Sequence, residues 1–437
     1  MLSRLDRASS REKSAGRPAE LEPAVAFARV LRHTRAHGHA IDSELGPPRT
    51  AISSTECLTV NSSGSRPSTA LFAIVLTCLW AANTCADERL WLDGTINGKP
   101  VRLVFDTGSS QCGLLPDTAE RLGLKSKPPT SAVRPGEGGL IGMTAELYLP
   151  QWKVSSTITF ETLEFPAYLG KVDLEGLYGW NQIRSNICAI DAEALTVKLL
   201  DRVPEEATAW TKFIVVERAP TLSLALPGQL WTIAVDTGAP DGVALVSQKW
   251  REWKAANTNA PLTLWAAYSP PSGAAVCEVS WAKELSLGPL TLSGVPVRQA
   301  NLIESAHGQP IVGLAALKRL DFIIDGKRGV AYLRPKRTPP PPYPHNRLGA
   351  EFMPRHWQAD DLVAQVVDGS PAQVAGIRNG DILLKVGDRD VTNWRKAGRG
   401  PPERSCELPA GTKLDLTLKR GEETLKVSVV LRDILLP

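Results

Sequence analysis

Two stretches in the middle of the chain repeat the same order of apolar and polar positions. Each stretch opens with two short apolar runs on either side of a turn that contains glycine, which is the pattern of a β-hairpin. The runs and turn glycines are 90–92, Gly98 and 103–105 in the first copy, and 222–224, Gly228 and 233–235 in the second. Because the whole pattern occurs twice, we predict two similar, mostly β lobes.

Each predicted hairpin ends in the same short motif. The motifs are Asp106-Thr107-Gly108-Ser109 in the first copy and Asp236-Thr237-Gly238-Ala239 in the second. Downstream, each copy has two apolar residues followed by glycine, at Gly179 and Gly313, and then an acid twelve residues further on. The sequence offset between the two copies is slightly larger at these later features than at the motifs. One insertion of about four residues in an intervening loop explains the changed offset, because loops accept such changes readily.

The repeated aspartate carries the candidate chemistry. One such motif alone is weak evidence for a catalytic site, because strand-ending turns favour aspartate and glycine for structural reasons. Two copies on matching hairpins favour a pair of carboxylates, Asp106 and Asp236, held together. Like charges held close together cannot both ionise, so the pair shares one proton. The ionised member can then take a proton from water while the protonated member polarises a carbonyl group.

With these motifs, residues 88–335 resemble the retropepsin-like aspartic peptidases, as two pseudo-symmetric lobes fused in tandem. The resemblance implies an aspartic endopeptidase whose catalytic residues are Asp106 in lobe 1 (88–201) and Asp236 in lobe 2 (210–335). It implies polypeptide substrates, no cofactor, and a monomer, since one chain supplies both acids. The residues implied to support the active-site loops are Thr107, Gly108, Ser109, Thr237, Gly238 and Ala239.

The same resemblance implies how the loops are held. Thr107 and Thr237 would join them by hydrogen bonds across the lobe interface, and the two downstream glycine elements would pack behind them. Two loops, 136–142 and 269–273, are either flaps over the cleft or ordinary surface loops. Asp241, close after the second motif, adds a third acid beside the site.

Other function classes have little support in the sequence. His307 is the only histidine in the two lobes, which disfavours a serine or cysteine triad. No histidine pair has ligand spacing, so no metal site is predicted. Seven cysteines show neither metal nor redox spacing, and their pairing cannot be read. The net charge of +4 over 437 residues gives no reason to expect a nucleic acid partner.

The C-terminal part resembles a PDZ domain, an α+β fold. Residues 336–346 are rich in proline and predict a stiff linker. The resemblance in 347–437 rests on the segments 362–372, 375–377 and 379–383. It implies that a C-terminal peptide adds to a sheet edge. The residues implied to hold the peptide carboxylate are Leu348, Gly349 and Ala350.

The groove helix of such a domain is poorly encoded here. Glycines and prolines between 394 and 410 disfavour a long helix. A packing or docking domain without a working groove is therefore the alternative to a peptide-binding one.

The N-terminal region predicts export. Residues 1–68 are rich in arginine, serine, alanine and proline, and predict either a disordered extension or a start assigned too far upstream. Residues 69–86 carry no charge, follow Arg66, and end in small residues, which is the order of a secretory signal peptide. They form either a cleaved signal or a membrane anchor. Both predict a periplasmic or extracellular protein, and the alternative function is an inactive exported peptide-binding or envelope scaffold protein.

Overall fold

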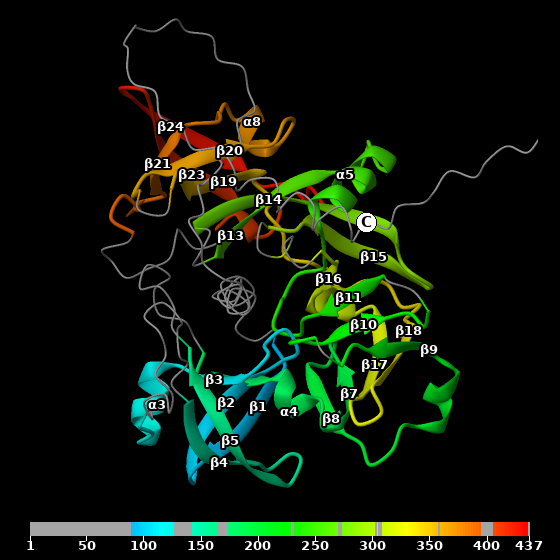
Figure 1. The fold of residues 1–437 in the computed structure, drawn as a ribbon. Helices are drawn as coiled ribbons and strands as arrows, with labels where there is room; N and C mark the ends of the chain where they lie inside the picture. Colours follow the sequence, from blue (N-terminus) through cyan, green and yellow to red (C-terminus); the bar gives the residue numbers. More distant parts are fainter. Residues whose placement is uncertain are drawn as a thin grey trace, which may run out of the picture. The chain divides into compact units, whose positions relative to one another are not determined.

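The computed structural model of the chain is mostly β, as predicted (Figure 1). It describes residues 89–125, 142–163, 174–217, 219–228, 231–269, 273–301, 304, 308–356, 359–394 and 405–435. The predicted extension (1–68) and signal segment (69–86) lie outside these residues. Within the described ranges, no helix is both long and apolar enough to cross a membrane.

Lobe 1 contains a closed sheet of six strands, with a helix after the third of them. Its elements are β1 (Trp91–Ile96), β2 (Lys99–Asp106), β3 (Cys112–Leu114), α3 (Pro116–Leu122), β4 (Gly142–Leu149), β5 (Val154–Thr162) and β6 (Gly176–Gly179). The strand order is β1-β2-β6-β3-β5-β4, and pairing of Thr95 with Tyr148 closes the ring. Asn97 and Gly98 have φ angles of 49° and 77°, so they form the two-residue turn that the first hairpin requires.

Lobe 2 repeats this strand order, which explains the repeat in the sequence. Its elements are β10 (Ser223–Ala225), β11 (Thr232–Val235), β12 (Val243–Leu245), α5 (Ser247–Ala256), β13 (Leu262–Ser269), β14 (Gly273–Leu287), β15 (Leu290–Gln299), β16 (Ile311–Val312) and α7 (Leu314–Leu317). The order β14-β15-β12-β16-β11-β10 matches β4-β5-β3-β6-β2-β1 of lobe 1. Lobe 2 stays open, because β10 pairs with β9 (Thr211–Val215) instead of closing the ring.

A shared sheet joins the two lobes. Lobe 1 supplies β7 (Ile187–Asp191) and β8 (Thr196–Leu199), and lobe 2 supplies β17 (Leu320–Asp325) and β18 (Val330–Pro335). Cys188 lies opposite Ile324, and Ile190 lies opposite Phe322. In the internal repeat, Phe322 is the counterpart of Cys188, and Ile324 is the counterpart of Ile190. Exchanging the two copies therefore converts the pair of Cys188 and Ile324 into the pair of Phe322 and Ile190. A pseudo-two-fold axis therefore passes through the centre of the β7–β17 pairing.

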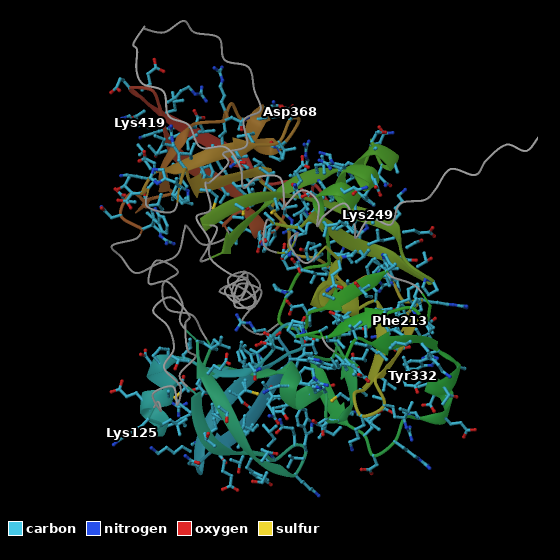
Figure 2. The ribbon with its side chains drawn as sticks, viewed as in Figure 1. Lys125, Phe213, Lys249, Tyr332, Asp368 and Lys419 are labelled. Atoms are coloured by element: carbon cyan, nitrogen blue, oxygen red, sulfur yellow. The ribbon has the colours of Figure 1, made fainter. Side chains whose placement is uncertain are left out.

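Both faces of the shared sheet are buried. Phe213 on β9 belongs to one apolar core that includes residues of both lobes. Tyr332 on β18 follows Ala331, the partner of Phe213, and therefore points to the other face. There it packs in a second cluster with Ala207 of the 3-10 helix η4 (Glu205–Ala209); Figure 2 labels Phe213 and Tyr332. The continuous core makes the two lobes one folded body.

The PDZ part forms a separate sheet with its own core. Its elements are β19 (Ala350–Pro354), β20 (Leu362–Val366), α8 (Pro371–Val374), β21 (Ile382–Val386), β22 (Arg389–Asp390), η5 (Ser405–Glu407), β23 (Lys413–Arg420) and β24 (Glu423–Val430). The strand order is β19-β20-β21-β23-β24, with β22 beside β21. Ser370 caps α8 by accepting a hydrogen bond from the N–H of Gln373. Residues 395–404, in the region of the poorly encoded groove helix, lie outside the described residues.

Contacts of the proline-rich segment and of the C-terminal end attach the PDZ part to lobe 2. The proline-rich segment is extended, and Arg319 donates hydrogen bonds to the carbonyls of Thr338 and Pro339. At the other end, Leu435 packs with Val279 and Trp281 of β14. The segment predicted as a linker is therefore held against lobe 2 at these carbonyls.

Candidate active site

The structure brings the two motif aspartates together at the junction of the lobes. Asp106 is the last residue of β2, and Asp236 directly follows β11. Each is only 2% exposed, and the two carboxyl groups share a hydrogen bond. Two acids from distant parts of the chain thus form one buried pair.

Each aspartate is held by the backbone of its own loop. The N–H groups of Gly108 and Ser109 donate to Asp106 Oδ1 at 2.8 and 3.0 Å. In lobe 2, the N–H groups of Gly238 and Ala239 donate to Asp236 Oδ1 at 2.9 and 3.1 Å. One oxygen of each carboxyl is therefore fixed.

The two threonines join the loops as the resemblance implied. The N–H of Thr107 donates to Thr237 Oγ1 at 3.0 Å, and the N–H of Thr237 donates to Thr107 Oγ1 at 3.1 Å. The hydroxyl of Thr107 donates to the carbonyl of Val235, and that of Thr237 donates to the carbonyl of Phe105, each at 2.7 Å. All four hydrogen bonds are buried and cross between the lobes.

Glycine is required after each threonine because the opposite carboxyl occupies the space of a side chain. A Cβ atom at Gly108 would overlap Asp236 Cγ, and one at Gly238 would lie 2.7 Å from Asp106 Cγ. Glycine is required at the downstream positions for a similar reason. A Cβ atom at Gly179 would overlap the carbonyl oxygen of Gln111, so this backbone packs directly against the first loop.

The same backbone hydrogen bond supports each loop from behind. The N–H of Trp180, which begins α4 (Trp180–Ile183), donates to the carbonyl of Ser109 at 2.8 Å. The N–H of Leu314, which begins α7, donates to the carbonyl of Ala239 at 2.7 Å. The predicted packing of the Gly179 and Gly313 elements behind the loops is present in both lobes.

Burial and charge repulsion act on the pair together. Burial is the largest cause that raises the pKa of Asp106, and the neighbouring Asp236 raises it further. The N–H groups of Gly108 and Ser109 oppose this shift, because they favour the ionised carboxylate. The pair therefore retains one proton at a pH where an isolated aspartate is ionised.

Neither a metal nor a thiol is part of this arrangement. Among the described residues, no group of three or more histidine, cysteine or acidic side chains could hold a metal ion. The four cysteines described form no disulfide with one another, and Cys112 is the one beside the first loop. Its buried Sγ accepts from the N–H of Gly179 at 3.3 Å, and burial raises its pKa to about 12. Cys112 is therefore a packing residue and not a nucleophile.

The predicted flap loops fall partly outside the described residues. Loop 136–142 is described only at Gly142, the first residue of β4. In lobe 2, the β13–β14 ladder extends to the pair of Ser269 and Gly273, and 270–272 lie outside the described residues. Ser269 and Gly273 are thus the last described pair of a long hairpin.

Donors in the predicted carboxylate loop of the PDZ domain are already used. The N–H groups of Leu348 and Gly349 donate to Oδ1 of Asn346 at 3.0 and 2.9 Å. The side-chain N–H of Asn346 donates to the backbone carbonyl of Ala350, and the backbone carbonyl of Asn346 accepts from the hydroxyl of Thr263 on β13. The sequence analysis missed Asn346, although an asparagine two residues before the loop is a known signal for such a turn.

Comparisons with known proteins agree with the two resemblances. Residues 92–180 match the family model described as aspartyl protease, and residues 362–408 match that of the PDZ domain. Over 92 residues the chain is 27% identical to the serine protease HTRA1 of Xenopus tropicalis. This match covers 21% of the chain but only 16% of that protein. The chain thus carries an aspartyl-protease domain, of a kind found in peptidases, together with a PDZ domain.

Proposed function

We propose that the protein is an aspartic endopeptidase that hydrolyses peptide bonds with water activated by Asp106 and Asp236. The observation that carries this proposal is the buried pair of carboxyl groups, joined by one hydrogen bond and fixed by equivalent contacts in both lobes. Burial and charge repulsion leave the pair with one proton, so one carboxyl can act as general base and the other as general acid.

The reaction follows from this protonation state. The ionised carboxylate takes a proton from water, and the water oxygen adds to the carbonyl carbon of the peptide. The protonated carboxyl donates a hydrogen bond, and then its proton, to the carbonyl oxygen. The resulting diol collapses when one hydroxyl loses a proton, the C–N bond breaks, and the amine leaves with a proton from the pair. The pair ends with one proton, as it began.

The neighbouring parts suggest the substrate class. The long β13–β14 hairpin of lobe 2 is suited to cover an extended polypeptide. The PDZ domain would add a docking site for substrate or partner. With the signal-like segment at 69–86, we propose exported or envelope polypeptides as substrates.

The test is cleavage of a denatured protein mixture by the full chain between pH 3 and 8. Asp106→Asn and Asp236→Asn are compared with wild type, and circular dichroism checks that each variant is folded. We expect both substitutions to abolish cleavage, because the one carboxyl that remains cannot act as general acid and general base together. Cleavage that survives either substitution would exclude the shared pair.

The second candidate is a peptide-binding protein that does not cleave. It is favoured by the PDZ match, because that domain can bind peptides without any catalysis. It predicts that wild-type protein binds peptides at every pH tested and leaves them intact.

A further inference from the structure

The two catalytic loops are nearly symmetric, but their surroundings are not. Gln111 and Asp241 each lie five residues after the catalytic aspartate of their copy. Gln111 is neutral and exposed, and its side-chain oxygen accepts a hydrogen bond from Asn181. Asp241 is only 5% exposed and carries an acid into the base of the second loop.

A buried arginine pairs with Asp241. Arg298, on β15, is 2% exposed, and its Nε donates a short hydrogen bond to Asp241 Oδ2. Its two terminal nitrogens donate to both carboxylate oxygens of Glu304, each at 2.6 Å. The guanidinium group also lies over the ring of Trp265, 4.7 Å from the centroid. One guanidinium thus bridges two buried carboxylates.

Glu304 is fixed from its other side. It is fully buried, and its Oε2 accepts a hydrogen bond from the N–H of Asn301 at 2.8 Å. In return, the N–H of Glu304 donates to the side-chain oxygen of Asn301 at 3.0 Å. With these bonds, the cluster of Asp241, Arg298 and Glu304 holds two acids and one base, and its formal net charge is −1.

The cluster is connected to the loop that holds Asp236. The backbone carbonyl of Asp241 accepts from the N–H of Ala315. Ala239, two residues earlier in the same loop, donates its N–H to the carboxylate of Asp236. A Cβ atom at Gly313 would lie 2.6 Å from the backbone carbonyl oxygen of Asp241, so the two backbones are in close contact. Burial raises the pKa of Asp241, Arg298 opposes this shift, and the charges of Glu304 and Asp236 add to it, so Asp241 and Asp236 interact.

We propose that the Asp241–Arg298–Glu304 cluster is a positioning system that fixes the lobe 2 loop and makes the catalytic pair asymmetric in charge. This inference rests on the proposed function. On the Asp106 side, Gln111 supplies no charge, and Glu161, an acid that interacts with Cys112, is only half-buried. On the Asp236 side, the cluster holds a buried net negative charge. That charge opposes loss of the last proton from the pair, and so extends to higher pH the range in which the pair holds one proton.

Asp241→Asn tests the proposal with little change in shape. Asparagine can still accept from Arg298 Nε, Arg298 keeps Glu304 as partner, and the cluster becomes neutral. We expect the alkaline limb of the kcat profile to move to lower pH by on the order of one unit, while KM changes little. Gln111→Ala, five residues after Asp106 in lobe 1, is the control and leaves the alkaline limb of the kcat profile in place.

A titration that does not depend on cleavage separates this inference from the proposed function. The carboxyl groups of the pair are followed by carbon-13 NMR in the full chain, and Asp106→Asn and Asp236→Asn assign the signals. If the pair titrates identically in wild type and Asp241→Asn, the inference is overturned. If the pKa values of the pair differ between wild type and Asp241→Asn, but neither protein cleaves any peptide, the inference stands and the peptidase proposal fails.

Glu304→Gln provides the second variant, which decides the matter if Asp241→Asn does not fold. It removes the same unit of charge at the other end of Arg298. We expect the titration of the pair to move to lower pH, as in Asp241→Asn, and an unchanged titration would overturn the inference.

Discussion

Thr107 and Thr237 hold each other through a closed set of hydrogen bonds. The N–H of each donates to the hydroxyl of the other, and each hydroxyl donates to a carbonyl in the opposite lobe. Both residues are fully buried. Water therefore cannot replace a lost partner without rearrangement, and the lobes are joined at the point where the catalytic pair forms.

Thr107→Val tests the strength of this connection. Valine has nearly the same shape but leaves the carbonyl of Val235 and the N–H of Thr237 without a partner. Each buried group left unpaired costs roughly 1–3 kcal/mol, so the free energy of unfolding falls clearly. Thr107→Ser keeps the hydroxyl and serves as control. Urea unfolding of both variants measures the difference, and equal stabilities would show that the hydroxyl bonds contribute nothing.

Asp106→Asn is expected to change how stability depends on pH. The pKa of Asp106 is raised in the folded state, first by burial and then by Asp236. The folded state therefore holds a proton that the unfolded chain loses above about pH 4, and wild-type stability falls as the pH rises from there. The variant loses the repulsion between the two carboxyl groups, so its stability depends less on pH, and relative to wild type it gains stability as the pH rises from 4 to 7.

Thermal unfolding between pH 4 and 8 measures this difference. Asp117→Asn, at an exposed aspartate of α3, is the matched control and follows the wild-type curve. Parallel curves for wild type and Asp106→Asn would mean that the pair does not retain its proton when folded.

The sequence predicts most of the catalytic pair because the information is local and occurs twice. A turn glycine, an apolar strand and an Asp-Thr-Gly motif are each readable within about ten residues. Two copies then indicate two lobes and one pair. The antiparallel pairing of β7 with β17 could not be read, because nothing in Ile187–Asp191 specifies a partner as distant in the chain as Leu320–Asp325.

Arg298 and Glu304 were also unreadable, and the repeat explains why. Arg298 lies beside Ala244 on β12, and the equivalent pairing in lobe 1 places Glu161 beside Gly113. The copies therefore differ at this position, and comparing them gives no signal. Only the fold brings Arg298 under the loop that carries Asp241.

Asn346→Ala tests the predicted carboxylate loop of the PDZ domain. The substitution frees the N–H groups of Leu348 and Gly349, which donate to Asn346 Oδ1 in the wild-type chain. We predict roughly tenfold tighter binding, about 1.4 kcal/mol, of an apolar hexapeptide with a free C-terminal carboxylate. The same peptide with an amidated C-terminus gains nothing.

Fluorescence anisotropy with both peptides measures this effect in the full chain. Asn346→Asp keeps an acceptor oxygen at the loop and adds a negative charge, so it serves as the control and binds no better than wild type. If Asn346→Ala binds the two peptides equally, the loop is not a carboxylate site, and the docking alternative is favoured.

His345 predicts a loss of stability in mild acid. Its Nε2 accepts from the N–H groups of Ile434 and Leu435 at 3.2 and 3.3 Å, and its Nδ1 lies 3.0 Å from the carbonyl of Tyr343. Both contacts require the neutral ring with its proton on Nδ1. Burial lowers the pKa of His345 below its ordinary value of 6.5, Arg347 lowers it further, and Tyr343 and Asp433 oppose the shift. The contribution to stability is thus complete above that value and is lost as the pH falls through the lowered pKa.

Protonation would place a second donor against two N–H groups, so we expect the C-terminal tail to leave lobe 2 first. Hydrogen exchange at residues 431–435 should speed up between pH 7 and 5, after correction for the intrinsic rate, while exchange in β17 stays constant. His345→Gln is neutral throughout and removes the pH dependence, whereas His356→Gln, at an exposed histidine, retains it. If His345→Gln keeps the wild-type pH dependence, some other group controls the tail.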